Sequence, residues 1–146
     1  MNKLIAVVGM AGSGKSIATD YLKDNGWTKI YFGGVVYDHM RKEGIEITPE
    51  SQKEYRENIR KKYGMAAVAV LLEEEIKESI KKQNTVLDGL YSWDEYIFLK
   101  EKFPELKLIC VVCDKQLRYE RIAIRPDRPF NHDEIIIRDT SEIENL

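Results

Sequence analysis

A glycine-rich segment directly after a short apolar run constrains this chain more than any other feature. Residues 4–8 read LIAVV, and residues 9–16 read GMAGSGKS. An unbroken apolar run of this length is typical of a strand buried on both faces of a parallel sheet. The second segment matches G-x-x-x-x-G-K-[ST] at every fixed position, and a helical segment from Lys15 to about Asp24 follows. This succession predicts a phosphate-binding loop, or P-loop; a chance match has a probability on the order of 1%.

The residue types of the P-loop each have a chemical role. Glycines let the backbone curl closely around an anion, so that successive N–H groups point at phosphate oxygens. The helix that follows adds its N-terminal dipole and its unpaired donors. We expect the Lys15 ammonium to reach the β- and γ-phosphates and the Ser16 hydroxyl to ligate Mg²⁺. The residues expected to bind ATP are Gly9, Ala11, Gly12, Ser13, Gly14, Lys15, Ser16 and Ile17.

Further apolar segments alternate with helical patterns along the chain. Strands are predicted at residues 28–32, 85–88 and 106–113, the last of them buried. Strands that alternate with helices indicate an α/β domain with a mostly parallel sheet. Since the chain has no internal repeat, low-complexity segment or linker, residues 1–146 are expected to form a single domain. Helices are expected at residues 15–24, 33–42, 48–63, 65–80, 92–103, 114–124 and from 131 onward.

Asp88 is the second candidate functional residue. It ends a predicted strand and precedes Gly89. At the carboxyl edge of a parallel sheet, such a carboxylate faces the ligand and can hold the hydration shell of Mg²⁺. The alternative is a surface aspartate in a tight Asp-Gly turn. With a P-loop in the same chain we favour the metal role, so Ser16 and Asp88 are the expected metal ligands.

An arginine cluster near the C-terminus is the third candidate. Arg118, Arg121 and Arg125 fall at i, i+3 and i+7 of one predicted helix and so share a face. Arg128 follows in a proline-rich loop, and Arg138 lies on the last predicted helix. Guanidinium groups are suited to clamp the charge of a transferring phosphoryl group. The alternative, a solvated helix face paired with nearby acids, remains open for each single arginine.

Residues after the second predicted strand are candidates for binding a phosphate acceptor. Gly34, Tyr37 and Arg41 lie there, and Arg60 on the next helix could add a cation for a phosphate on the acceptor. Gly89, beside the candidate metal ligand, is the remaining candidate. A solvated helix face is the alternative for both arginines.

Composition excludes several classes of function. With 23 basic and 25 acidic residues, the net charge is −2, which argues against binding a nucleic acid polymer. No apolar run approaches the roughly 20 residues of a membrane span. Cys110 and Cys113 are too close for a disulfide framework, and three-residue spacing in a strand cannot chelate one metal, so we expect buried thiols in a reducing cytoplasm. Trp27 and Trp93 are expected to be packing residues.

Five stretches together resemble a known group of enzymes. They are residues 7–16, 32–48, 58–69, 86–96 and 118–129, which read VVGMAGSGKS, FGGVVYDHMRKEGIEIT, NIRKKYGMAAVA, VLDGLYSWDEY and RYERIAIRPDRP. The pattern resembles P-loop nucleoside-phosphate kinases of the adenylate kinase and dephospho-CoA kinase group. It is most similar to the dephospho-CoA-kinase-like ATPases related to adenylate kinase.

The resemblance implies a three-layer α/β/α P-loop NTPase fold with a parallel sheet of strand order 2-3-1-4-5. It also implies an acceptor-binding helical region at about residues 33–64 and a short lid at about residues 125–131. Gly12, Gly14, Lys15 and Ser16 would then bind ATP, and Asp88 would organise Mg²⁺. Arg121, Arg125 and Arg128 would be lid residues that close on the phosphates.

The chain departs from the pattern of these kinases at two places. Adenylate kinases carry an arginine shortly after the Asp-Gly pair, whereas residues 88–92 read DGLYS. The group also continues through a further strand and helix, so here we expect strand order 2-3-1-4 with the fifth strand missing. Strand 106–113 would then lie at a sheet edge, where unpaired backbone groups invite pairing with another chain. We therefore expect a homodimer through this edge.

These observations predict an ATP- and Mg²⁺-dependent phosphotransferase. The acceptor would be a nucleotide or a similar small phosphorylated or nucleoside compound, with no nucleic acid polymer and no membrane as partner. The expected catalytic residues are Lys15, Asp88, Arg121, Arg125 and Arg128, which act by positioning and electrostatic stabilisation. The alternative is an NTP-binding regulatory or interaction module with only slow hydrolysis. The missing arginine favours this alternative, and the arginine cluster favours the kinase.

Overall fold

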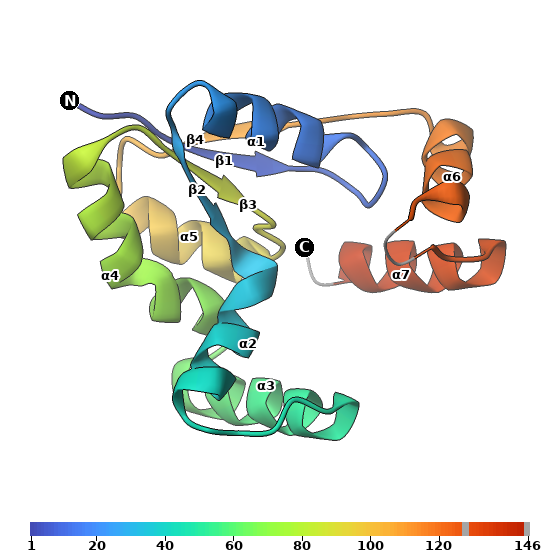
Figure 1. Cartoon of the computed structure of the whole chain (residues 1–146), viewed down its shortest axis with the longest axis horizontal. Helices are drawn as coiled ribbons and strands as arrows, with labels where there is room; N and C mark the ends of the chain where they lie inside the picture. The colour runs from blue at the N-terminus through green and yellow to red at the C-terminus, as the bar shows by residue number, and fades with distance from the viewer. Residues whose placement is uncertain (127–128, 145–146) are drawn as a thin grey trace.

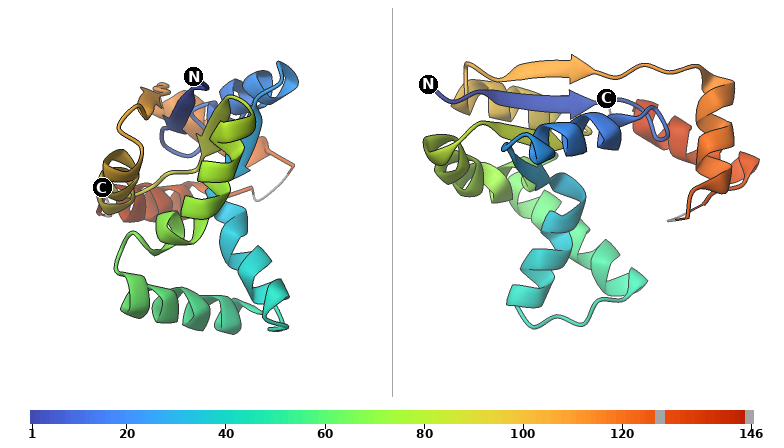
Figure 2. Two further views of the ribbon diagram at one scale, coloured as in Figure 1. Left: turned by 90° about the vertical axis from the view of Figure 1, so that its left-hand side faces the viewer. Right: turned by 45° about the horizontal axis from the view of Figure 1, so that its top comes forward.

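Four parallel strands form the sheet in this computed structural model, which describes residues 1–126 and 129–144. The spatial order is β2-β3-β1-β4, the order that the resemblance implies without its fifth strand. Helix α1 covers one face of the sheet, and α4 and α5 lie on the other (Figures 1 and 2). The predicted three-layer α/β/α architecture is therefore confirmed. The strands are β1 (Leu4–Val8), β2 (Thr28–Tyr31), β3 (Thr85–Asp88) and β4 (Lys107–Cys110).

The helices begin where the sequence places capping residues. The Thr48 hydroxyl accepts a hydrogen bond from the Ser51 N–H at 3.1 Å, and Ser92 and Glu95 cap a second helix in the same reciprocal way. None of the described helices is long and apolar enough to cross a membrane. The helices are α1 (Lys15–Asp24), α2 (Phe32–Lys42), α3 (Pro49–Tyr63), α4 (Ala67–Lys82), α5 (Trp93–Lys102), α6 (Lys115–Ile124) and α7 (His132–Glu144).

The apolar core lies mainly between the sheet and the layer formed by α4 and α5. Leu87 from the sheet packs there with Leu72 of α4 and Leu99 of α5, all at most 2% exposed. A second cluster, which includes Met40 and Ile59, joins α2 and α3 to α4. In Figure 1 these two helices form an arm below the sheet, whereas α6 and α7 lie beyond the carboxyl end of β1. The two helical arms flank the carboxyl edge of the sheet.

Strand β4 differs from the sequence-based expectation. The predicted buried strand at 106–113 is shorter, and all four residues of β4 are exposed because β4 is an edge strand with one neighbour. Cys110 is consequently exposed and Cys113 only half-buried, so the prediction of buried thiols is wrong. Trp93 is 60% exposed at the start of α5, where its ring centre lies 5.3 Å from that of Tyr96. An apolar run indicates a strand but not how many layers cover it.

Strand register fixes which residues meet at the carboxyl edge. Asp88 pairs in register with Val7 of β1 on one side and with Tyr31 of β2 on the other. The P-loop directly follows β1. The loop, Asp88 and Tyr31 therefore succeed one another along the same edge of the sheet, where ligands of open α/β sheets bind.

Candidate functional site

The P-loop leaves β1 and turns into α1 through glycines with positive φ. Gly14 (φ 103°) is the N-cap of α1, where a side chain would be strained. Gly12 (φ 77°) lies against α6: a Cβ atom there would come within 2.9 Å of the Arg118 carbonyl oxygen and of Ile122 Cγ1. The sequence therefore needs glycine at both positions, once for the helix start and once for the close packing of α6.

Several backbone donors of the P-loop have no partner. The N–H groups of Gly14, Lys15 and Ser16 donate to no group in the described part of the chain. All three residues line one pocket. Unpaired N–H groups at a helix N-terminus, together with the helix dipole, form an anion-binding site. This is the arrangement that the motif predicts for the nucleotide phosphates.

Lys15 supplies a cation to the same pocket. Its Nζ donates to the carbonyl oxygens of Gly9 and Met10, the second at 3.1 Å, so the side chain is folded back over the loop. Burial lowers the pKa of Lys15, and the nearby carboxylates of Glu142 and Asp88 oppose this shift. A phosphate would offer this partly desolvated ammonium a full negative charge in place of two carbonyl oxygens.

Asp88 is buried at the end of β3, and one of its two carboxylate oxygens, Oδ2, already contacts two side chains. Oδ2 accepts a hydrogen bond from Thr19 Oγ1 at 3.0 Å and forms an ion pair with Lys29 Nζ at 3.0 Å. Lys29 also contacts Asp20 at 2.7 Å. Burial disfavours the ammonium of Lys29, but the hydrogen bonds to Asp20 and Asp88 outweigh it and raise the pKa. Oδ1 of Asp88 accepts no hydrogen bond from the described residues.

The side-chain oxygens beside the P-loop fit a magnesium ion that binds together with the phosphates. The Ser16 hydroxyl is exposed at the start of α1, and it and Asp88 line the same pocket. No group of three or more His, Cys, Asp or Glu side chains that could hold a metal occurs among the described residues. Mg²⁺ keeps several waters and is commonly held by one or two carboxylates plus substrate phosphates, which matches a site with Ser16 and Asp88 alone.

The pocket has a volume of about 430 Å³ and runs along the carboxyl edge of the sheet. Arg121 lies over the P-loop, with its Nη1 at 3.4 Å from the Gly12 carbonyl oxygen. Arg125 lies directly after α6, with its guanidinium 5.0 Å from the centre of the Phe130 ring. Both arginines line the pocket. Arg128 and part of the expected lid at 125–131 lie outside the described residues.

Arg118, the first arginine of the predicted cluster, is buried rather than exposed to a ligand. Its guanidinium forms a bidentate ion pair with Asp139 of α7, at 3.1 and 2.8 Å. The same Nη1 donates to the Ala11 carbonyl oxygen at 3.0 Å. Arg118 thus joins α6, α7 and the P-loop, a role that the shared helix face does not reveal.

Helix α7 brings to the pocket Arg138, which belongs to the predicted arginine cluster, and Glu142, which the sequence did not indicate. Arg138 Nε donates to Glu142 Oε1 at 2.7 Å, and Nη2 donates to the Tyr91 hydroxyl at 2.7 Å. All three residues line the pocket. Burial raises the pKa of Tyr91, and the Arg138 charge opposes this shift. The i, i+4 spacing of Arg138 and Glu142 indicates a pair on one helix face, but nothing in the sequence places α7 beside the P-loop.

The candidate acceptor residues are spread more widely. Gly34 lies in the first turn of α2, and Gly89 lines the pocket. Tyr37 is half-buried on α2 and lies outside the pocket lining. Arg41 and Arg60 are exposed and also lie outside the lining; Arg41 is paired with Asp38 at 3.2 Å. Their part in acceptor binding stays a prediction.

Tyr31, at the end of β2, is a further pocket residue that the sequence analysis missed. Its ring rests on glycines: a Cβ atom at Gly33 would collide with it, and Cβ atoms at Gly34 and Gly89 would be 3.6 and 3.5 Å away. The side chain is nevertheless 50% exposed. The pocket therefore ends, opposite the P-loop, in an aromatic ring with one face supported by backbone.

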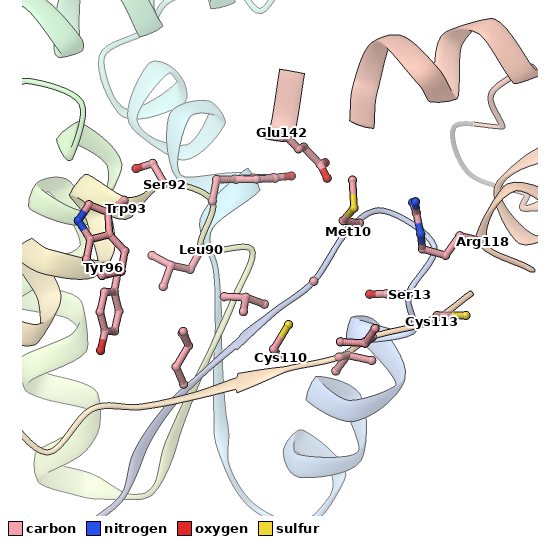
Figure 3. A pocket seen from close by; sticks show the side chains of 16 residues that line it. Met10, Ser13, Leu90, Ser92, Trp93, Tyr96, Cys110, Cys113, Arg118 and Glu142 are labelled. Atoms are coloured by element: carbon pink, nitrogen blue, oxygen red, sulfur yellow. The ribbon is translucent and has the colours of Figure 1, made fainter. Parts of the chain in front are cut away.

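A second cavity of about 380 Å³ lies between the P-loop, β4 and the start of α5 (Figure 3). Its wall is mainly apolar, with Leu90, Trp93 and Tyr96 on one side. The Ser13 hydroxyl on this wall is buried and has no hydrogen-bond partner in the described structure. Tyr91 and Glu142 border both cavities, so this apolar space adjoins the phosphate pocket.

Known structures share this fold at low sequence identity. A sugar kinase from Janibacter sp. HTCC2649 superposes with a TM-score of 0.60 at 14% identity, covering 100% of this chain and 78% of that one. A gluconokinase from Sinorhizobium meliloti 1021 gives 0.56 at 18% identity, with 99% and 74% covered. TT1252 from Thermus thermophilus gives 0.64 at 17% identity, with 99% and 83% covered. These likenesses show the fold alone.

Relatives identified by sequence cover nearly the whole chain. A UPF0200 protein of Thermococcus onnurineus (strain NA1) is 32% identical over 146 residues, which is 97% of this chain and 79% of the relative. A UPF0200 protein of Staphylothermus marinus is 35% identical over 144 residues, with 97% and 74% covered. The profile of a family described as "AAA domain" matches residues 5–143. The matches support a P-loop kinase-like family and do not single out the dephospho-CoA kinases. This chain is a member of the UPF0200 family and carries an AAA domain with a P-loop kinase-like fold.

Proposed function

We propose that this protein is an ATP- and Mg²⁺-dependent phosphotransferase that acts on a small nucleotide-like or nucleoside-like acceptor. The observation that carries the proposal is the single pocket along the carboxyl edge of the sheet. It joins the unpaired P-loop donors and Lys15 at one end to Asp88 in the middle and Tyr31 at the other end. In this order, a donor triphosphate on the P-loop and an acceptor near Tyr31 would lie in line along the edge of the sheet.

Catalysis in this proposal is positioning and electrostatic stabilisation. Lys15 moves from the loop carbonyls to the β- and γ-phosphates, and the P-loop N–H groups hold the phosphate oxygens. Arg121 and Arg125 offset the charge that spreads over the transferring group. Ser16 and Asp88 would hold Mg²⁺, which would supply charge neutralisation at the phosphate oxygens. No residue of the pocket has to form a covalent intermediate.

Two assays with a matched pair of variants test the proposal. ATP affinity is measured by titration calorimetry with Mg²⁺ present, and ADP formation is followed with and without a panel of acceptors. Lys15→Ala is expected to abolish ATP binding or turnover, whereas Lys23→Ala, an exposed lysine of the same helix, leaves both unchanged. Full transfer activity in Lys15→Ala contradicts the assignment.

One observation favours a second function, an NTP-binding module with slow hydrolysis. Tyr91 lies in the segment after Asp88 and Gly89, where adenylate kinases carry an arginine. The same ADP assay distinguishes the two functions. A phosphotransferase forms ADP faster when its acceptor is present, and a regulatory module hydrolyses ATP at one slow rate whatever is added.

A further inference from the structure

The acceptor end of the pocket can be located from the geometry of in-line transfer. The donor triphosphate lies on the P-loop, and the attacking oxygen approaches the γ-phosphorus from the side opposite the leaving group. Along the carboxyl edge that side is the one beyond Asp88, where Tyr31 closes the pocket. Tyr91 and the Arg138–Glu142 pair line the same pocket, where the Tyr91 hydroxyl accepts a hydrogen bond from Arg138 and Glu142 is also near Lys15.

The cations near this end are already neutralised. Arg138 is paired with Glu142 at 2.7 Å, and the Glu142 side chain is only 13% exposed. Lys29 is paired with both Asp88 and Asp20. A phosphate monoester carries up to two negative charges and is commonly bound by arginines with bidentate geometry. Of the cations on this side of the pocket, Arg138 and Lys29 are therefore already paired with carboxylates.

The surfaces that this end does offer are neutral. The Tyr31 ring lies against Gly33, Gly34 and Gly89 and is half exposed, so a planar ring can stack on its exposed part. The Tyr91 hydroxyl is a neutral hydrogen-bonding group whose burial disfavours ionisation. An acceptor with a planar ring and hydroxyl groups matches this lining better than an acceptor with a phosphate does.

We propose that the phosphate acceptor is an uncharged, hydroxyl-bearing compound with a planar ring, of the nucleoside class, whose ring stacks on Tyr31. This inference rests on the proposed phosphotransferase function. The sequence leaves phosphorylated and nucleoside acceptors open, and the inference selects the nucleosides. Tyr31 and Tyr91 are the residues that determine this choice.

Phosphoryl transfer to a hydroxyl group needs a residue that accepts the hydroxyl proton, and the pocket contains one. The acceptor oxygen forms a bond to the γ-phosphorus, and the bond from this phosphorus to the β,γ-bridging oxygen breaks, with its electron pair leaving on ADP. The hydroxyl proton passes to the Glu142 carboxylate, which borders the pocket beside Arg138. A phosphate acceptor has no such hydroxyl proton to lose, so Glu142 has a role only with the proposed class.

A panel of acceptors tests the substrate class directly. ADP formation is measured with four nucleosides, adenosine, guanosine, cytidine and uridine, with their 5′-monophosphates, and with gluconate as a ring-free hydroxyl acceptor. For at least one nucleoside, kcat/KM is expected to exceed that of its own monophosphate by about tenfold or more. This ratio corresponds to the loss of about one ion pair. Preference for the monophosphates or for gluconate overturns the inference and leaves the phosphotransferase intact. No stimulation by any acceptor contradicts the phosphotransferase itself.

Variants then test the two tyrosines. Tyr91→Arg adds a cation and is expected to shift the preference toward monophosphates by about tenfold, whereas the uncharged Tyr91→Phe keeps the nucleoside preference. Tyr31→Ala is expected to raise the KM for the nucleoside about tenfold with a smaller effect on kcat. Tyr21→Ala, an exposed tyrosine of α1, is the matched control. ATP affinity is measured for each variant, since unchanged ATP affinity shows an intact fold. An unchanged KM for the nucleoside in Tyr31→Ala, together with an unchanged acceptor preference in Tyr91→Arg, overturns the inference.

Discussion

Arg118 and Asp139 form a bidentate ion pair, 3.1 and 2.8 Å long, that connects α6 to α7 beneath the P-loop. Both residues are almost fully buried, at 5% and 7% exposure. Because Arg118 also donates to the Ala11 carbonyl oxygen, one guanidinium fixes the positions of both helices and of the loop. The placement of the α7 residues Arg138 and Glu142 in the pocket depends on this connection.

Removal of Arg118 is therefore expected to destabilise the protein strongly. Arg118→Met leaves the Asp139 carboxylate buried without a partner, which costs about 3–5 kcal/mol. The measurement is the free energy of unfolding in urea. Removing both charges, in Arg118→Met with Asp139→Leu, should recover most of the loss. Lys81→Ala, which breaks an exposed pair with Glu78, should cost less than about 1 kcal/mol. Equal effects of the two single variants would contradict this role.

Lys29 is expected to hold Asp88 for metal binding. Lys29→Met leaves Asp88 with only the Thr19 hydroxyl, and the free energy of unfolding should fall by about 3 kcal/mol. Asp20→Asn, which removes only the exposed partner of Lys29, should cost less than about 1 kcal/mol. Because the pKa of Lys29 is raised, the contribution of the pair is present at neutral pH and is lost only as pH rises through that pKa. Loss of the contribution near neutral pH would show that the pair is not formed.

Gly12 and Gly26 allow a test of the packing between the P-loop and α6. Both have positive φ, at 77° and 85°, but a Cβ atom at Gly26 meets nothing within 4 Å. Gly26→Ala should lower the free energy of unfolding only by the backbone strain, about 1–2 kcal/mol. Gly12→Ala should cost a further ~1–3 kcal/mol, since its methyl group collides with α6. Chemical denaturation compares the two, and equal losses would mean that α6 does not pack on the loop.

ATP binding is expected to weaken at alkaline pH because of Lys15. Burial holds the pKa of this lysine below the usual range, so its charge is lost as pH rises through a value lower than that of a solvated lysine. ATP affinity should decline over that range. Lys15→Arg keeps its charge at these pH values and should show a flatter profile. Calorimetric titration from pH 7 upward is the measurement; identical pH profiles would exclude Lys15 as the titrating group.

The exposed edge strand β4 is expected to mediate self-association. Leu108 and Ile109 are 45% and 44% exposed, and the outer backbone groups of an edge strand are available for another strand. Sedimentation over a range of concentrations should reveal a dimer. Ile109→Lys places a charge on this edge and should give a monomer, and a wild-type protein that is monomeric at every concentration would contradict the expectation.

Local patterns were sufficient to predict most strands and helix starts, whereas the strand order followed only from the resemblance to P-loop kinases. A P-loop motif lies between a strand and a helix, so one stretch of sequence predicts both the strand before it and the helix from Lys15. Asp88 could be identified because it ends a short apolar strand. Capping pairs such as Ser92 and Glu95 mark a helix start within a few residues.

The remaining site residues depend on contacts between distant segments. Arg118 and Arg121 lie on one helix three residues apart, yet one is buried against Asp139 and the other lines the pocket. Which one faces the phosphates depends on where α7 packs, and helix periodicity carries no information on that. Tyr31 was missed for a similar reason, since its ring becomes a pocket wall only once β2 and β3 pair. The exposure of β4 likewise depends on the number of neighbouring strands.

The most direct test of this account follows the γ-phosphate itself. The protein is incubated with γ-labelled ATP, Mg²⁺ and a nucleoside, and the label is then located by chromatography. The account predicts that the label appears covalently on the nucleoside with the wild-type protein and not with Lys15→Ala. Label that is released only as inorganic phosphate, at the same rate with and without every acceptor of the panel, would contradict it.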